Sequence, residues 1–105
     1  MSKSLDSVLI ERAIALVESG WTQNAMARDD RGRIVCPRSK RAVSFCGYGA
    51  IVRAACEMAG NSSTYSAFMR QLSAHFAVLE FVRMNDSGTQ IGVVDAMRER
   101  LAQAR

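Results

Sequence analysis

A chain of 105 residues with 49% hydrophobic and 23% charged residues has the composition of one ordinary globular domain, which excludes a disordered protein. Its formal net charge is +4 at neutral pH. We predict a single domain over residues 1–105. The first residues lack the pattern of a secretory signal, and Glu11, Arg12 and Glu18 interrupt the longest apolar stretch. We therefore expect a cytoplasmic protein that makes no contact with a membrane.

The segment from Leu5 to Val17 places its apolar residues at helical spacing and its polar residues on another face. This pattern predicts an amphipathic first helix. Ser4 is the candidate N-cap, and we expect Gly20 to close the helix in a left-handed conformation.

The helical period is lost between Trp21 and Val43. Within this stretch, the run from Asp29 to Gly32 is typical of a turn in which the glycine takes a positive φ. We predict a short β-hairpin around this turn, with strands at roughly residues 25–28 and 33–36. Pro37 should end the second strand, because it has no N–H group to offer a sheet.

The second helix is predicted to begin near Ser44 and to end at Gly60. Apolar residues lie nearly all round it, so we expect it at the centre of the fold. Gly47 and Gly49 make its first turn thin, which favours close packing against neighbouring helices.

A third helix follows, with Ser63 or Thr64 as its cap, and its continuation over residues 77–83 could be helix or strand. The run from Asn85 to Gly88 is expected to be a loop, after which Thr89 caps a final helix. The predicted fold is therefore mainly α, a single small domain of about four helices with a short β-hairpin between the first and second helices.

Three cysteines, Cys36, Cys46 and Cys56, cannot all pair, which fits a reducing compartment. The chain has no C-x-x-C motif, and His75 is its only histidine. Structural zinc sites need more ligands of these types at close spacing. We expect no metal and no cofactor.

One candidate catalytic set can be assembled from the sequence. Cys46 near a helix start would be the nucleophile, His75 the base, and Asn85 or Asp86 the group that orients the base. The alternative for Cys46 is a buried packing residue, because free cysteine is among the most frequently buried residue types. We expect no enzymatic activity, although a thiol-dependent enzyme or redox protein stays an alternative.

The positive charge is concentrated between residues 28 and 41, a segment that contains six cationic side chains and two carboxylates. Such a segment can bind the phosphates of a nucleic acid in a salt-dependent way. The alternative is a solvated loop with internal ion pairs, since no aromatic residue for base stacking lies inside the segment. The candidate contacts are Arg28, Arg31, Arg33, Arg38, Lys40 and Arg41.

Three short motifs follow one another along the chain at a characteristic spacing: Gly20-Trp21, then Cys46-x-x-Gly49-Ala50, then Asn85-Asp86 with Thr89. This pattern resembles a family of small uncharacterised bacterial and phage proteins, a domain of unknown function. The resemblance implies one mostly helical domain and assigns no catalytic residue. It points to a shared ligand-binding or structural motif made of Trp21, Cys46, Gly49, Asn85, Asp86 and Thr89.

The leading hypothesis for function is a small non-enzymatic interaction module that binds a protein partner or a second copy of itself. Its methionines would supply adaptable packing in the core or at a contact face. These are Met26, Met58, Met69, Met84 and Met97.

Overall fold

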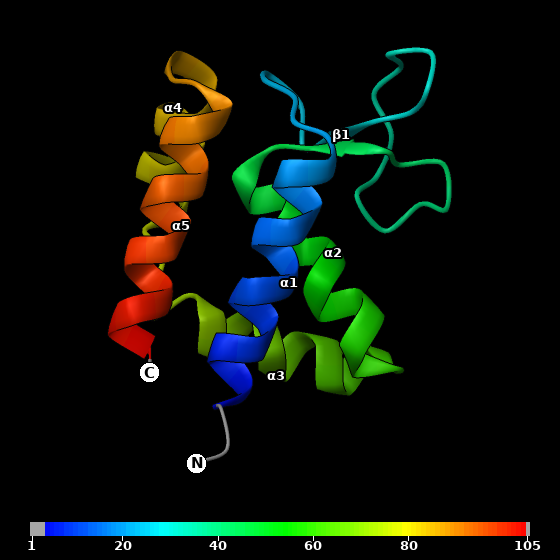
Figure 1. Ribbon diagram of the computed structural model, residues 1–105. Coiled ribbons are helices and arrows are strands. Elements are labelled where there is room, and N and C mark those ends of the chain that lie inside the picture. Colours follow the sequence, from blue (N-terminus) through cyan, green and yellow to red (C-terminus); the bar gives the residue numbers. More distant parts are fainter. Residues whose placement is uncertain (1–3, 105) are drawn as a thin grey trace.

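Five α-helices and one two-stranded sheet make up residues 4–104, the part of the chain that the computed structural model describes (Figure 1). A mainly helical fold with a short antiparallel strand pair between the first two helices was predicted, and the structure confirms it with five helices rather than four. In chain order the elements are α1 (Leu5–Ser19), β1 (Ala27–Arg28), β2 (Ser44–Phe45), α2 (Gly47–Ala59), α3 (Ser62–Leu72), α4 (Val78–Ser87) and α5 (Gln90–Ala104).

Helix α1 begins and ends close to the predicted residues. Ser4 is the N-cap, and its Oγ accepts a hydrogen bond from the Ser7 N–H at 3.1 Å. Gly20 ends the helix, but its φ of −175° is extended backbone, so the predicted left-handed conformation is wrong. A glycine fits here for another reason, because a Cβ at this position would overlap the carbonyl oxygen of Val43.

The two strands pair Ala27 with Phe45 and Arg28 with Ser44. The predicted second strand at 33–36 contributes only an isolated bridge from Ile34, and Ser44, expected at a helix start, lies in β2. Hydrogen bonds from other segments hold the chain extended here, since the Phe45 N–H donates to the Gly20 carbonyl at 2.9 Å. The turn itself is as predicted, with Gly32 at a φ of 79°.

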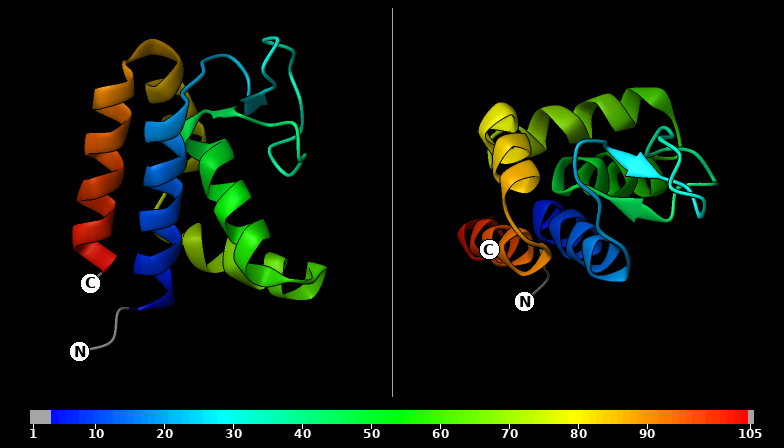
Figure 2. Two further views of the ribbon diagram at one scale, coloured as in Figure 1. Left: turned by 45° about the vertical axis from the view of Figure 1, so that its right-hand side comes forward. Right: turned by 90° about the horizontal axis from the view of Figure 1, so that it is seen from above.

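Helix α2 lies at the centre of the fold, as its apolar sequence predicts, and packs against α1, α3 and α4 (Figure 2). Its first turn comes very close to other segments. A Cβ at Gly47 would meet the ring of Phe81, and a Cβ at Gly49 would overlap the carbonyl oxygen of Met26. These glycines therefore let α4 and the β1 segment pack directly on the backbone of α2.

In the last three helices the structure differs from the prediction at two places. Asn61 caps α3 by accepting from the Thr64 N–H at 2.8 Å, so the cap is neither Ser63 nor Thr64. The ambiguous segment 77–83 becomes the start of α4, which continues through Ser87 and includes Asn85 in place of the expected loop. Thr89 caps α5 as predicted, with its Oγ1 accepting from the Gly92 N–H at 3.1 Å.

Helix α5 runs antiparallel to α1 along its length (Figure 2). Within residues 4–104, no helix has both the length and the apolar character needed to cross a membrane.

Candidate functional site

Asn85, in the last turn of α4, is fully buried, and its side chain hydrogen-bonds to two other parts of the chain. Its Oδ1 accepts from the Trp21 Nε1–H at 2.8 Å and from the Gly47 N–H at 3.0 Å. Its Nδ2 donates to the Thr22 carbonyl and to Asp86 Oδ1, both at 3.1 Å. A single amide thus joins α4 to the end of α1 and to the start of α2.

A second layer of hydrogen bonds surrounds this amide. The Gln23 Nε2 group lies 3.1 to 3.2 Å from the carbonyl oxygens of Asn85, Asp86 and Gly88, which end helix α4. Asp86 Oδ1 also accepts from the Asn24 N–H at 2.9 Å, and Asn24 takes a positive φ of 62°. We call this group the Asn85 cluster: Trp21, Thr22, Gln23, Asn24, Gly47, Asn85 and Asp86.

Cys46 borders the Asn85 cluster and caps α2. Its Sγ accepts a hydrogen bond from the Gly49 N–H at 3.2 Å, and the side chain is buried. Burial raises the pKa of the Cys46 thiol, the Asp86 carboxylate raises it further, and hydrogen bonds from backbone N–H groups such as that of Gly49 only partly oppose this. Cys46 is therefore a neutral thiol at physiological pH and not a helix-start thiolate.

His75 lies at the other end of the molecule from Cys46. Its Nε2 is 2.7 Å from Asp6 Oδ2, in the first turn of α1, whereas the far end of α1 leads to Gly20, which bonds Phe45 beside Cys46. The 15 residues of α1 span about 22 Å. A general base must lie within hydrogen-bond reach of its nucleophile. The fold therefore places Cys46 beside Asn85 and Asp86 but leaves His75, the predicted base, out of reach of Cys46.

Most residues of the motif singled out in the sequence lie close together in the fold. Trp21, Asn85 and Asp86 meet directly, and Cys46 immediately precedes Gly47 of the same cluster. Gly49 contacts the backbone of Met26, and Thr89 caps α5. Sequence reasoning missed Thr22, Gln23 and Asn24, although their position directly after Gly20-Trp21 was the signal that could have found them.

The segment 28–41, here called the basic loop, uses two of its six cations to fix its own shape. Arg28 donates to Thr22 Oγ1 at 2.8 Å and to the Gly32 carbonyl at 3.0 Å. Arg33 pairs with the buried Asp29 at 2.8 Å. Burial alone would raise the pKa of Asp29, but hydrogen bonds from Arg33 and from the Arg31 N–H outweigh it, so the pKa is lowered.

The other four cations of the basic loop, Arg31, Arg38, Lys40 and Arg41, are exposed. The Arg38 guanidinium lies over the ring of Tyr65 from α3, 4.9 Å from its centroid. A hollow of about 230 Å³ opens beside this pair. The loop projects from the helical body on the side away from α4 and α5 (Figure 1).

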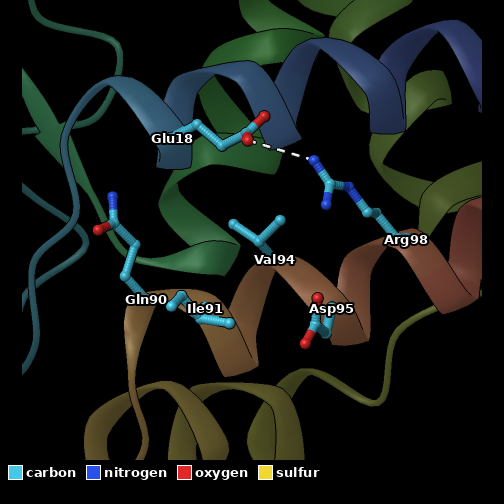
Figure 3. A pocket seen from close by; sticks show the side chains of 6 residues that line it. All are labelled: Glu18, Gln90, Ile91, Val94, Asp95 and Arg98. Carbon is cyan, nitrogen blue, oxygen red and sulfur yellow. Dashed lines mark hydrogen bonds and ion pairs between the residues drawn. The ribbon is translucent and has the colours of Figure 1, made fainter.

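Another hollow, of about 250 Å³, lies between α1 and α5, and none of the sequence-predicted site residues lines it (Figure 3). An ion pair between Glu18 and Arg98 at 3.2 Å crosses it. Among residues 4–104, no three side chains of the metal-ligating types gather closely enough to hold an ion.

Comparison with known families matches residues 1–103 to the model of a family of unknown function (DUF6197). The chain belongs to the DUF6197 family. Searches of curated proteins and of solved structures find no significant match. The resemblance to a family of unknown function is thus confirmed over nearly the whole chain, and membership of DUF6197 names no activity.

Proposed function

We propose that this DUF6197 protein is a non-enzymatic interaction module that binds a nucleic-acid strand through its basic loop. The observation that carries the proposal is the set of four exposed cations at residues 31–41 on a projecting loop. Arg33 neutralises Asp29, so Asp30 is the only exposed carboxylate of this segment. Several cations close together attract phosphates whatever the base sequence.

Tyr65 supplies the aromatic ring for base stacking that is missing from the sequence of the basic loop. Its ring is partly exposed beside Arg38, and both an aromatic ring and a guanidinium plane can stack on an unpaired base. Phosphate-binding cations next to a stacking group are typical of surfaces that bind single strands. We therefore expect the protein to prefer a single strand to a duplex.

The positions of Cys46 and His75 also favour a binding role over the thiol-enzyme alternative. Cys46 is buried, and its pKa is raised, so it is a poor nucleophile. His75 is paired with Asp6 at 2.7 Å, about one helix length away from Cys46.

One observation favours a protein partner as the second candidate. Ile34, on the same loop, is 66% exposed, and Val43 close by is 50% exposed. Apolar side chains of this kind are used in protein interfaces. A protein partner of this loop would bind less tightly to the Ile34→Ser variant and would show little dependence on salt.

The test is fluorescence anisotropy with a labelled single-stranded oligonucleotide, titrated at salt concentrations between about 50 and 200 mM. We expect the affinity to fall steeply with salt. The double variant Lys40→Ala/Arg41→Ala should bind more weakly and reduce the slope of log affinity against log salt by about 1.5 to 2. Tyr65→Ala should weaken binding, whereas Tyr65→Phe should retain it.

The matched control is Arg70→Ala/Arg83→Ala, which removes the same net charge from exposed positions on α3 and α4. This variant should retain most of the affinity. An equal loss in both double variants would mean that only the net charge matters. That result, or no binding at low salt, would overturn the proposal.

A further inference from the structure

The outer face of α5 carries a stripe of four residues spaced four, three and four apart, which places them on one side of the helix. Ile91 is 75% exposed, the highest value among the large apolar side chains of residues 4–104. Asp95 and Ala102 are also exposed, and the Asp95 carboxylate forms no hydrogen bond or ion pair with another described residue. Arg98 completes the stripe (Figure 3).

This stripe is complementary to itself when read in the opposite direction. If α5 packs antiparallel to α5 of a second copy, with the two-fold axis between positions 95 and 98, Asp95 faces Arg98 of the second copy and Arg98 faces its Asp95. The same register sets Ile91 opposite Ala102, a large side chain against a small one. Charge and size therefore match at all four positions.

The surface beside Ala102 has room for the protruding isoleucine. A hollow of about 380 Å³ lies there, and Ile14 and Leu101, both buried, form its apolar floor. Arg98 borders this hollow and also the hollow beside Ile91, so the two are neighbours along the groove between α1 and α5. In a two-fold arrangement each copy places its Ile91 at the other's hollow.

We propose that two copies of this chain associate through the outer faces of their α5 helices, antiparallel and related by a two-fold axis. Two-fold contacts of one patch with itself are the commonest form of oligomer. The pair between Arg98 and Glu18 is no obstacle, because both side chains are about half exposed and a guanidinium has five N–H donors. One helix per copy makes a small interface, so we expect a reversible dimer of modest affinity.

The experiment is sedimentation velocity on the full chain over a range of concentrations, with two charge-reversal variants. In Asp95→Arg both charged positions of the stripe are positive, and in Arg98→Asp both are negative. Each variant alone should dimerise at least about tenfold more weakly than the original chain, because like charges face each other. An equimolar mixture of the two should associate again, because every cation then faces a carboxylate.

Three further variants distinguish an effect at this surface from a general effect of substitution. Ile91→Ser should weaken association, whereas Ile34→Ser, which changes another exposed isoleucine, located on the basic loop, should not. Glu18→Gln removes the internal ion pair of Arg98 and should leave the dimer intact. Circular dichroism of each variant monitors folding.

Three results would overturn the proposal. The first is a chain that stays monomeric at the highest concentration reached. The second is a mixture of Asp95→Arg and Arg98→Asp that associates no better than either variant alone. If both variants remain helical, a folding defect would not explain that result. The third is an equal effect of Ile91→Ser and Ile34→Ser. The nucleic-acid proposal is independent of these outcomes.

Discussion

Asn85 satisfies hydrogen-bonding groups of two separate segments with one buried amide. Its partners include the Trp21 indole, the Gly47 N–H and the Thr22 carbonyl. An apolar side chain could fill the same space but would leave these buried groups without partners. Asn85 and Asp86 thus have a structural role, because they fix α4 against the segment that follows α1 and against the start of α2.

Replacing Asn85 by alanine should lower the free energy of unfolding by about 2 to 4 kcal/mol, because it leaves several buried donors and acceptors unsatisfied. Urea denaturation followed by circular dichroism measures this loss. The control is Asp86→Asn, which keeps an oxygen for the Asn24 N–H and should cost less than about 1 kcal/mol. A loss under about 1 kcal/mol in Asn85→Ala would contradict the structural role.

The three cysteines should differ sharply in reactivity. Cys36 is exposed and Cys46 is buried, with its pKa raised by burial and by the Asp86 carboxylate. In the native protein, an alkylating reagent should therefore modify Cys36 first and reach Cys46 only after unfolding. Mass spectrometry of peptides labelled between about pH 7 and 9 tests this. Faster labelling of Cys46 than of Cys36 at neutral pH would favour the thiol enzyme again.

At the level of elements, Glu57 on α2 ties two helices and the basic loop together. It pairs with Arg12 of α1 at 2.8 Å and with Arg53 one turn earlier at 3.0 Å. Arg53 also donates to the carbonyl oxygens of Pro37 and Ser39, at the end of the basic loop. The loop is therefore attached to α2 by a charged network and not by apolar packing alone.

This network predicts a pH dependence of stability. The hydrogen bond from Arg12 is the largest cause of the lowered pKa of Glu57; Arg53 lowers it further, and burial opposes both. A carboxyl group whose pKa is lower in the folded state stabilises the fold above its unfolded pKa, and this contribution is lost as the pH falls through the folded value. Glu57→Gln should therefore be less stable than the original chain at neutral pH, by less than about 1 kcal/mol.

The difference between Glu57→Gln and the original chain should begin to shrink as the pH falls below the ordinary glutamate pKa of about 4.3, and it should vanish once the pH is below the lowered pKa of Glu57 in the folded state. Thermal denaturation at several pH values measures it. Glu80→Gln is the matched control, since Glu80 is exposed in the first turn of α4 and takes part in no ion pair among the described residues. A gap that persists unchanged in acid would contradict the assignment to Glu57.

Helices α1, α2, α3 and α5 could be predicted because each has enough apolar residues at a regular spacing to reveal its buried face, whereas the segment of α4 was left as helix or strand and its last turn was expected to be a loop. Strand β2 could not, since Ser44 and Phe45 are held extended by Gly20, far away in the sequence. Asn85 and Asp86 were expected in a loop from their local preferences, and tertiary hydrogen bonds keep them helical instead. The motif residues of the Asn85 cluster were found in the sequence, but their convergence depends on contacts more than 60 residues apart.

For the whole molecule, the two proposed binding surfaces face away from each other. The basic loop and Tyr65 lie on one side of the helical body, and α5 forms the opposite edge (Figures 1 and 2). The molecule measures 40 × 29 × 23 Å along its principal axes. A dimer joined through α5 would therefore hold its two basic loops at its outer ends, where both could contact one long strand and increase the overall affinity.

The indole of Trp21 has a consequence for how this chain unfolds. It is the only tryptophan, and its N–H bonds to Asn85 on α4, 64 residues away. The fluorescence of this ring should therefore be sensitive to the docking of α4 against the segment that follows α1. If α4 is released before the other helices melt, the emission will change while the far-ultraviolet dichroism is still native. Exchange of the indole proton with deuterium will then follow the same local opening.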